Sequence, residues 1–245
     1  MRKFFKKFLK FAFYTSSAFL IIISIALIIS QTEGFRNYIR GYVITELENS
    51  IGGEVYVGKF YGNIFTGLGV DRFYINVDGK PFIKVLGLEV KYNPIGLIKG
   101  TYTFQTATVY KPEIYIIRGK DGKWNFQSVF KPTNRSGGSK FAISFGKLVV
   151  DDGKFIFIDS LNQKKSAIAE SLDCIDYSNL RVTDINAVIS GSYETNKINL
   201  RSLNLSFIIS EKFSGKIKGR VYADRDEVEI EDFEVLSEGS VVKFD

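Results

Sequence analysis

The chain has 245 residues, with 33 Lys and Arg, 27 Asp and Glu, no His and a single Cys at position 174. Without His, catalytic triads that use imidazole are excluded and the commonest metal ligand is missing. Five of the 33 basic residues lie in the first ten positions, leaving 28 basic against 27 acidic residues. The body therefore has no clustered excess of positive charge, which excludes a nucleic-acid partner.

Residues 11–30 carry no charge, and basic side chains stand directly before them: Arg2, Lys3, Lys6, Lys7 and Lys10. Twenty helical residues span about 30 Å, the thickness of a bilayer's hydrocarbon core. The basic residues predict that residues 1–10 stay in the cytoplasm while the rest of the chain crosses. A cleaved signal peptide is the alternative, but the only small-x-small site, Ser24–Ala26, lies inside the apolar run. An uncleaved transmembrane helix is favoured.

Residues 31–50 predict an amphipathic helix, because Phe35, Ile39, Val43 and Leu47 recur every four positions. We expect it to pack on the start of a β-rich body. That body is divided into a first unit, 51–133, a linker, 134–140, and a second unit, 141–245. Both units consist of short runs rich in β-branched and aromatic residues, separated by Gly, Pro, Asn and Asp.

Turn chemistry and side-chain parity predict how these strands connect. Asp78–Gly79 and Asp121–Gly122 are turn dipeptides, and Asp151–Gly153 predicts a hairpin between strands 141–150 and 154–159. Apolar residues change parity near Arg201–Ser202, which predicts a β-bulge. Successive strands joined by turns favour an antiparallel meander.

Apolar and polar residues alternate in the second unit, which predicts a sheet with one apolar and one solvated face. Few residues after position 50 favour a covering helix, so two architectures remain open. A second sheet would cover the apolar face in a closed β-sandwich or barrel. Alternatively, the sheet curls into a groove whose apolar side holds a lipid.

No catalytic constellation stands out in the sequence. Asp151–Asp152 and Asp224–Asp226 fit turns better than metal sites, and Glu227, Glu229 and Glu231 fit the solvated side of a strand. No phosphate-binding glycine loop or dinucleotide fingerprint is present. We therefore expect a protein that is not an enzyme and needs no cofactor or metal.

Several stretches resemble the AsmA-like family, especially its TamB branch. The similarity covers most of residues 1–160 and is carried, besides the N-terminal anchor, by 53–68, 90–100, 109–114, 121–126, 146–150 and 153–159. The resemblance implies a single-pass inner-membrane protein with a periplasmic body. It implies a curved, taco-like β groove that conducts phospholipids between the inner and outer membranes, and an outer-membrane partner reached through a further C-terminal region. We expect the chain to be part of a longer protein.

Acyl contacts in such a groove would come from the one-sided apolar residues. The main candidates are Leu203, Leu205, Phe207, Ile217, Val221, Val228 and Ile230. Weaker candidates are Phe73, Ile75, Val77, Phe155 and Phe157. The alternative function is an assembly factor or scaffold for outer-membrane proteins, which would pair its exposed strand edges with client chains.

Overall fold

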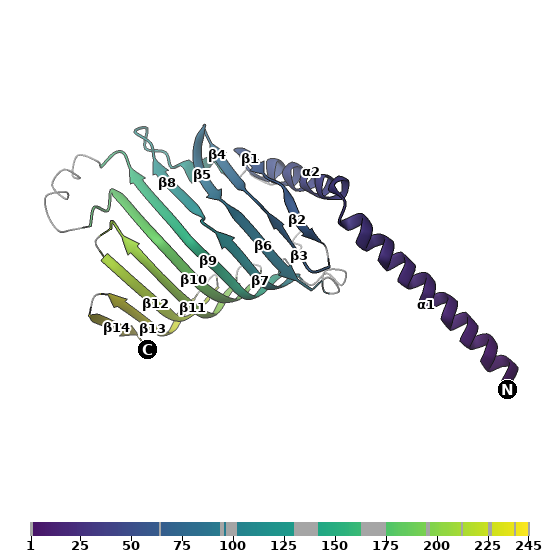
Figure 1. The fold of residues 1–245 in the computed structure, drawn as a ribbon. Coiled ribbons are helices and arrows are strands. Elements are labelled where there is room, and N and C mark those ends of the chain that lie inside the picture. Colours follow the sequence, from purple (N-terminus) through teal and green to yellow (C-terminus); the bar gives the residue numbers. More distant parts are fainter. Residues whose placement is uncertain are drawn as a thin grey trace.

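The computed structural model describes residues 2–63, 65–93, 96, 102–129, 142–162, 175–194, 197–211, 213–224, 227–237 and 239–244. These residues form two α-helices, a short 3₁₀ helix and one large β-sheet (Figure 1). The predicted linker 134–140 and Cys174 lie outside the described residues. The strands are β1 Glu54–Val57, β2 Phe60–Asn63, β3 Gly67–Val70, β4 Phe73–Val77, β5 Lys80–Val85, β6 Gly87–Tyr92, β7 Tyr102–Tyr110, β8 Glu113–Arg118, β9 Ala142–Asp159, β10 Asn179–Glu194, β11 Lys197–Ile209, β12 Phe213–Ala223, β13 Val228–Ser237 and β14 Ser240–Phe244.

Helix α1 covers Arg2–Ser30 and projects away from the sheet in Figure 1. Its segment Lys6–Ser30 is long and apolar enough to cross a bilayer, and none of its most apolar stretch is buried in protein. Large apolar side chains on a helix that nothing covers need another apolar environment. The helix expected over residues 11–30 is confirmed.

Helix α2, Glu33–Ser50, follows after a short turn and confirms the second predicted helix. Thr32 begins it, because its hydroxyl oxygen accepts a hydrogen bond from the Phe35 amide at 3.2 Å. Further along the helix, Arg40 Nε donates a hydrogen bond to the Val57 carbonyl of β1 at 2.6 Å. This bond ties α2 to the first strand of the sheet, as expected.

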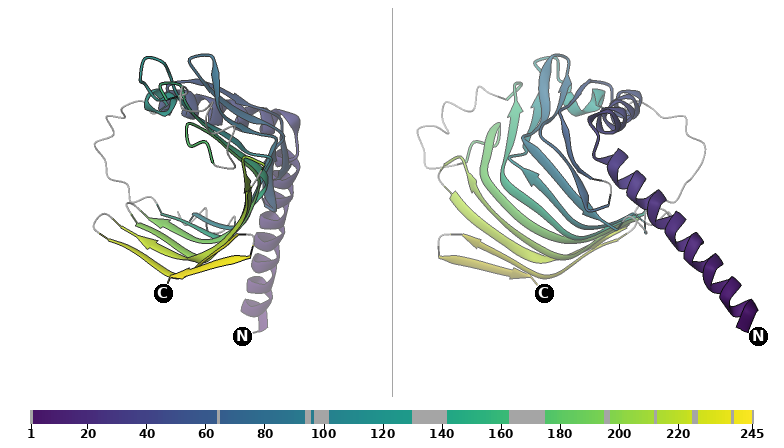
Figure 2. Two further views of the ribbon diagram at one scale, coloured as in Figure 1. Left: turned by 90° about the vertical axis from the view of Figure 1, so that its left-hand side faces the viewer. Right: turned by 45° about the vertical axis from the view of Figure 1, so that its right-hand side comes forward.

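All fourteen strands belong to one open sheet. Its order is β1-β4-β5-β8-β9-β10-β11-β12-β13-β14, and β2, β3, β6 and β7 pair in a second row that joins β9 through β7. Strands from both predicted β units are therefore continuous in one sheet. The described residues contain no second sheet, so the closed sandwich is not the architecture. Figure 2 shows the sheet curling into a C-shaped profile.

The predicted hairpin at Asp151–Gly153 is wrong. Residues 142–159 form the single strand β9, which pairs in parallel first with β7 and then with β8, so the sheet is mixed and not purely antiparallel. Asp152 has φ +54° and Lys111, between β7 and β8, has φ +46°. The two residues form an ion pair of 3.4 Å, and the Lys111 amide donates to the Asp151 carbonyl at 2.8 Å. The Asp-Asp-Gly sequence thus makes a bulge within a strand.

Similar irregularities line up across neighbouring strands. Asp184 in β10 has φ +51°, and the β10–β11 register shifts beside it. At Leu86, the single residue between β5 and β6, the extended strand is interrupted. The Leu86 amide donates a hydrogen bond to the Tyr110 carbonyl at 3.1 Å. Because bulges bend strands and increase twist, a row of them curves the whole sheet. The bulge predicted near Arg201–Ser202 is confirmed by the register shift between Leu200 and Leu203.

The buried core lies at the β1 end of the sheet. The last turn of α2 contributes Leu47 there, and the 3₁₀ helix η1, Asn125–Ser128, is followed directly by Val129; both side chains pack with those of β4 and β5. Its buried members are Ile51, Ile75, Val77, Phe82 and Val129. Ile75 and Val77 are 5% and 1% exposed, so these two candidates for acyl contact are corrected: they belong to the protein core.

Candidate functional site

Strand register assigns each side chain to one face of the sheet, because paired residues on neighbouring strands point the same way. One row of pairs crosses ten adjacent strands, from β2 to β14, and every member is apolar. The row is Phe60, Val70, Leu88, Val109, Val150, Ala187, Leu205, Ile217, Val235 and Val242. At about 4.8 Å per strand it is about 43 Å long, more than the thickness of a bilayer's hydrocarbon core.

This row lies on the inside of the curl. A Cβ at Gly153 would lie 3.1 Å from the Val150 side chain, so Gly153 and, by alternation along β9, Phe155 and Phe157 share the face of this row. The Phe157 ring contacts Trp124, just before η1, at 5.4 Å between centroids. Since η1 and α2 lie within the C-shaped profile of Figure 2, the face they cover is the concave one. We call the side chains of this row and their same-face neighbours the concave apolar face.

The main predicted candidates all lie on the concave apolar face. In β11 and β12, Leu205 faces Ile217, while Leu203 and Phe207 face glycines. The register of β12 and β13 adds the pair Val221–Ile230 and the pair Ala223–Val228. Val228 is 66% exposed and Ile230 is 45% exposed, whereas the other five are half-buried. No described protein layer covers this part of the sheet.

Among the weaker candidates, Phe155 and Phe157 lie on the same face, but Phe157 is partly covered by Trp124. Phe73 packs against the buried core with Ile75 and Val77. Helix α2 and η1 therefore close the β1 end of the concave apolar face. Sequence reasoning did not select Leu148 and Val150 in β9 or Ala187 and Ile189 in β10, although these residues alternate visibly with their neighbours. Their side of the sheet depends on bulges that parity alone does not locate.

Glycines in β12 leave room for aromatic rings to lie flat against the concave apolar face. A Cβ at Gly215 would lie 2.6 Å from the Phe207 ring, and one at Gly219 would lie 2.7 Å from the Phe233 ring. Both rings therefore lie over the backbone of the neighbouring strand instead of standing up from the sheet. The two rings therefore add aromatic surface to the concave side without projecting into the space that the curved sheet encloses.

The adjacent row of pairs, on the convex side, is mostly polar. It runs Tyr61, Gly69, Glu89, Thr108, Val149, Val188, Asn204, Lys218, Glu234 and Lys243. Lys243 bonds Glu234 at 2.5 Å and holds the pKa of that carboxyl below its ordinary value. Burial, followed by its hydrogen bond to Glu89, raises the pKa of Tyr61 to about 12. These groups suit a water-facing surface.

The convex side also has an open depression of about 760 Å³ over β8, β9 and β10. Its floor includes Ile117, Ile156 and Ile158, and its rim includes the ion pair Lys154–Glu113 at 3.6 Å. Acidic and basic side chains alternate around it, so its charge selects no particular ligand. The long apolar surface of the molecule is the concave one.

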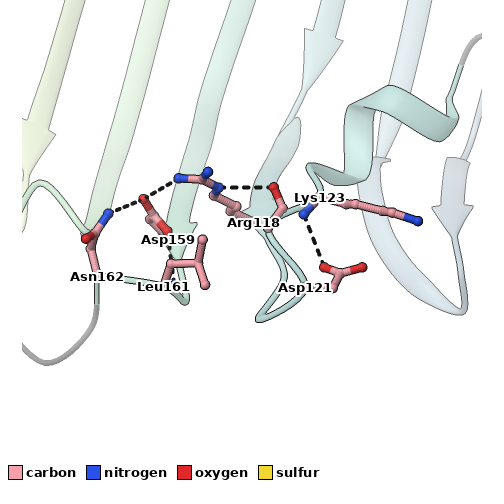
Figure 3. A network of polar contacts seen from close by, with 7 residues as sticks. Arg118, Asp121, Lys123, Asp159, Leu161 and Asn162 are labelled. Carbon is pink, nitrogen blue, oxygen red and sulfur yellow. Dashed lines mark hydrogen bonds and ion pairs between the residues drawn. The ribbon is translucent and has the colours of Figure 1, made fainter.

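A polar cluster marks the corner where the concave apolar face meets its covered end (Figure 3). Asp159 ends β9 and accepts hydrogen bonds from Asn162 Nδ2 at 2.8 Å and from the Leu161 amide at 3.1 Å. Arg118 lies 3.5 Å from the Asp159 carboxylate, donates to the Gly122 carbonyl and places its guanidinium over the Trp124 ring. The cluster fixes Trp124 against Phe157.

Among the described residues, no group of three or more Cys, Asp or Glu side chains is placed to hold a metal ion. The raised pKa of Tyr61 and the lowered pKa values of Glu234 and Asp159 belong to the pairs described above.

Comparison of the chain with protein-family models gives no match, and comparison with curated proteins gives none either.

Proposed function

We propose that this protein is anchored in the inner membrane by α1 and that its periplasmic concave apolar face carries the acyl chains of phospholipids between the two membranes. The unbroken apolar row across ten strands is the observation that carries the proposal. The resemblance to the TamB branch of AsmA-like proteins supports the same function. In that case the N-terminal basic residues stay cytoplasmic and the sheet belongs to a longer conduit.

Transfer of an acyl chain through water is opposed by the hydrophobic effect. Each exposed CH₂ costs about 0.8 kcal/mol, so a whole chain costs on the order of 10 kcal/mol. An apolar surface that continues from strand to strand lowers this barrier along its length. Because the sheet is open, the charged headgroup can remain in water and avoids the penalty of burial. No chemical step is required.

Site-specific photocrosslinking in cells tests the proposal. A photoreactive residue replaces Leu205 or Ile217 on the concave side, and Asn204 or Lys218 serves as the matched convex position next to it in sequence. We expect phospholipid adducts from the first pair and none from the second. Adducts with protein alone, or equal lipid labelling on both sides, would contradict lipid carriage.

A second candidate function, assembly of outer-membrane proteins, is favoured by the edge strand β14. Within the described residues β14 pairs only with β13, and Val241 and Val242 are 53% and 50% exposed. An unpaired apolar edge can add a strand from another chain. Photocrosslinks from Val241 to client polypeptides, with no lipid labelling at Leu205, would favour this function over lipid carriage.

A further inference from the structure

Helix α2 has an exposed side that the sheet does not use. Gly34, Tyr38, Gly41, Tyr42 and Thr45 recur at intervals of three or four residues and form an uncharged strip, which we call the tyrosine stripe. Tyr38 and Tyr42 are 70% and 65% exposed. A Cβ at Gly34 or Gly41 would meet nothing within 4 Å, so the space in front of the stripe is open.

The opposite side of α2 is held in place by the body. Leu47 packs against the buried core, and Arg40 Nε bonds the Val57 carbonyl at 2.6 Å. The helix therefore cannot turn the two tyrosines inward without losing these contacts. Their exposure follows from how α2 is docked.

The stripe begins close to the end of the membrane-spanning segment. Only Gln31 and Thr32 separate α1 from α2, and their amides donate to the carbonyls of Ile28 and Ile29 at 3.2 and 3.0 Å. This turn is tight, so α2 starts at the level where α1 leaves the hydrocarbon. The polar layer of a bilayer is about 5–7 Å thick on each side, and tyrosine is enriched there because its ring is apolar and its hydroxyl polar.

We propose that the tyrosine stripe lies in the lipid headgroup layer of the bilayer that α1 spans, with Tyr38 and Tyr42 as its anchors. From Gly34 to Thr45 the stripe carries no charge, and Glu48 follows one turn later, which suits contact of the first three turns of α2 with lipid headgroups. Since the other side of α2 covers the β1 end of the concave apolar face, this contact holds that end against the membrane surface. The inference rests on the membrane anchoring in the proposed function and is independent of lipid carriage.

Fluorescence quenching by brominated lipids tests the contact. Trp124 is the only Trp, so Trp124→Phe provides a background into which Tyr38→Trp or Tyr42→Trp introduces one reporter. The 245-residue chain is reconstituted into vesicles of phosphatidylethanolamine and phosphatidylglycerol, brominated near the headgroup or near the methyl end of the acyl chain. Tyr177→Trp, on an exposed tyrosine next to β10, is the matched control, and Ile22→Trp reports on α1.

We expect both stripe reporters to lose fluorescence with shallow bromines more than with deep ones, and Tyr177→Trp to lose none. Ile22→Trp should be quenched most by deep bromines. Stripe reporters that behave like Tyr177→Trp, or that shift to the blue without quenching, would overturn the proposal, because water or protein would then cover the stripe. An unquenched Ile22→Trp would overturn it together with the anchoring, while leaving the concave face to be judged by its own crosslinks.

A second measurement avoids any change at Trp124. A spin label at Thr45→Cys, in a Cys174→Ser background, should have a higher ratio of oxygen accessibility to nickel-chelate accessibility than a label at the exposed control position, Tyr177→Cys. A ratio no higher than that of the control would count against the headgroup location even if the tryptophan variants failed to fold.

Discussion

Asp159 shows how one carboxylate can join three segments of the chain. It is 8% exposed and accepts hydrogen bonds from Asn162 and Leu161, while Arg118 approaches it from β8 (Figure 3). The hydrogen bond from Asn162, the backbone bond from Leu161 and the charge of Arg118 together lower the pKa of Asp159. The ionised carboxylate is thus the form that the folded protein prefers.

Acid should weaken this cluster in a defined pH range. A carboxyl whose pKa is lower in the folded than in the unfolded state stabilises the fold above its unfolded value of about 3.9, and the contribution is lost as the pH falls through the folded value. We expect Asp159→Asn to lower the urea midpoint of the micelle-bound protein at neutral pH, with the difference from the parent protein shrinking below about pH 4.

Asp78→Asn is the control for this experiment. Asp78 lies in an exposed turn with φ +50°, a conformation that Asn also tolerates. Its midpoint should follow that of the parent protein at every pH. A deficit of Asp159→Asn that persists unchanged in acid would show that shape, and not charge, explains the effect.

At the scale of the element, the long strands are defined by their bulges. The bulge at Arg201–Ser202 was predictable, because apolar residues change parity on either side of it. The one at Asp152 was not, because Asp-Asp-Gly has the same local chemistry in a turn and in a bulge. Residues far away in the sequence keep β9 extended. Lys111 forms an ion pair with the Asp152 side chain, and the Asp152 amide donates a hydrogen bond to Asn186 Oδ1. The parallel pairing of β9 with β7 and β8 likewise joins strands from different parts of the sequence, so local sequence chemistry could not predict it.

Gly191 tests how tightly the bulged strands are packed. It is buried in β10, where a Cβ would overlap the Asn199 carbonyl oxygen and lie 3.1 Å from Leu200 Cα, both on the backbone of β11. Gly191→Ala should destabilise the protein by about 1–3 kcal/mol, because backbone atoms cannot move aside cheaply. Urea unfolding followed by far-UV circular dichroism measures the change.

Replacing Gly41 with Ala should instead stabilise the protein. Gly41 is exposed in the middle of α2 with open space around it, and Ala favours a helix over Gly by about 0.5–1 kcal/mol. Equal effects at the two positions would mean that the close approach of β10 and β11 near Gly191 does not contribute to stability.

At the scale of the molecule, alternation in the sequence predicted a two-faced sheet but not what covers each part of it. Ile75 and Ile217 lie on the same face, yet α2 and η1 bury the first and leave the second half-exposed. The difference comes from where two short helices pack, which no strand pattern contains. All fourteen strands belong to one open sheet, with no second sheet among the described residues, and this decides between groove and sandwich.

A charge placed in the apolar row should therefore weaken lipid binding and leave the protein folded. Leu205→Glu puts a carboxylate between Ala187 and Ile217, where an acyl chain would have to lie against it. Ser206→Glu, one residue further along β11, places the same charge on the convex side and is equally half-buried. Since an unpaired charge in apolar surroundings is strongly unfavourable, we expect Leu205→Glu to reduce the phospholipid that copurifies with the protein by about tenfold, equivalent to about 1.4 kcal/mol.

Mass spectrometry of the purified variants gives the ratio of phospholipid to protein, and thermal melting by circular dichroism shows whether both remain folded. Ser206→Glu should retain the lipid content of the parent protein. If the two variants keep or lose lipid together while both are folded, the lipid lies elsewhere, on α1 or in the surrounding detergent. Only a loss confined to Leu205→Glu locates acyl chains on the concave apolar face, because the two variants carry the same charge at neighbouring positions of β11 on opposite sides of the sheet.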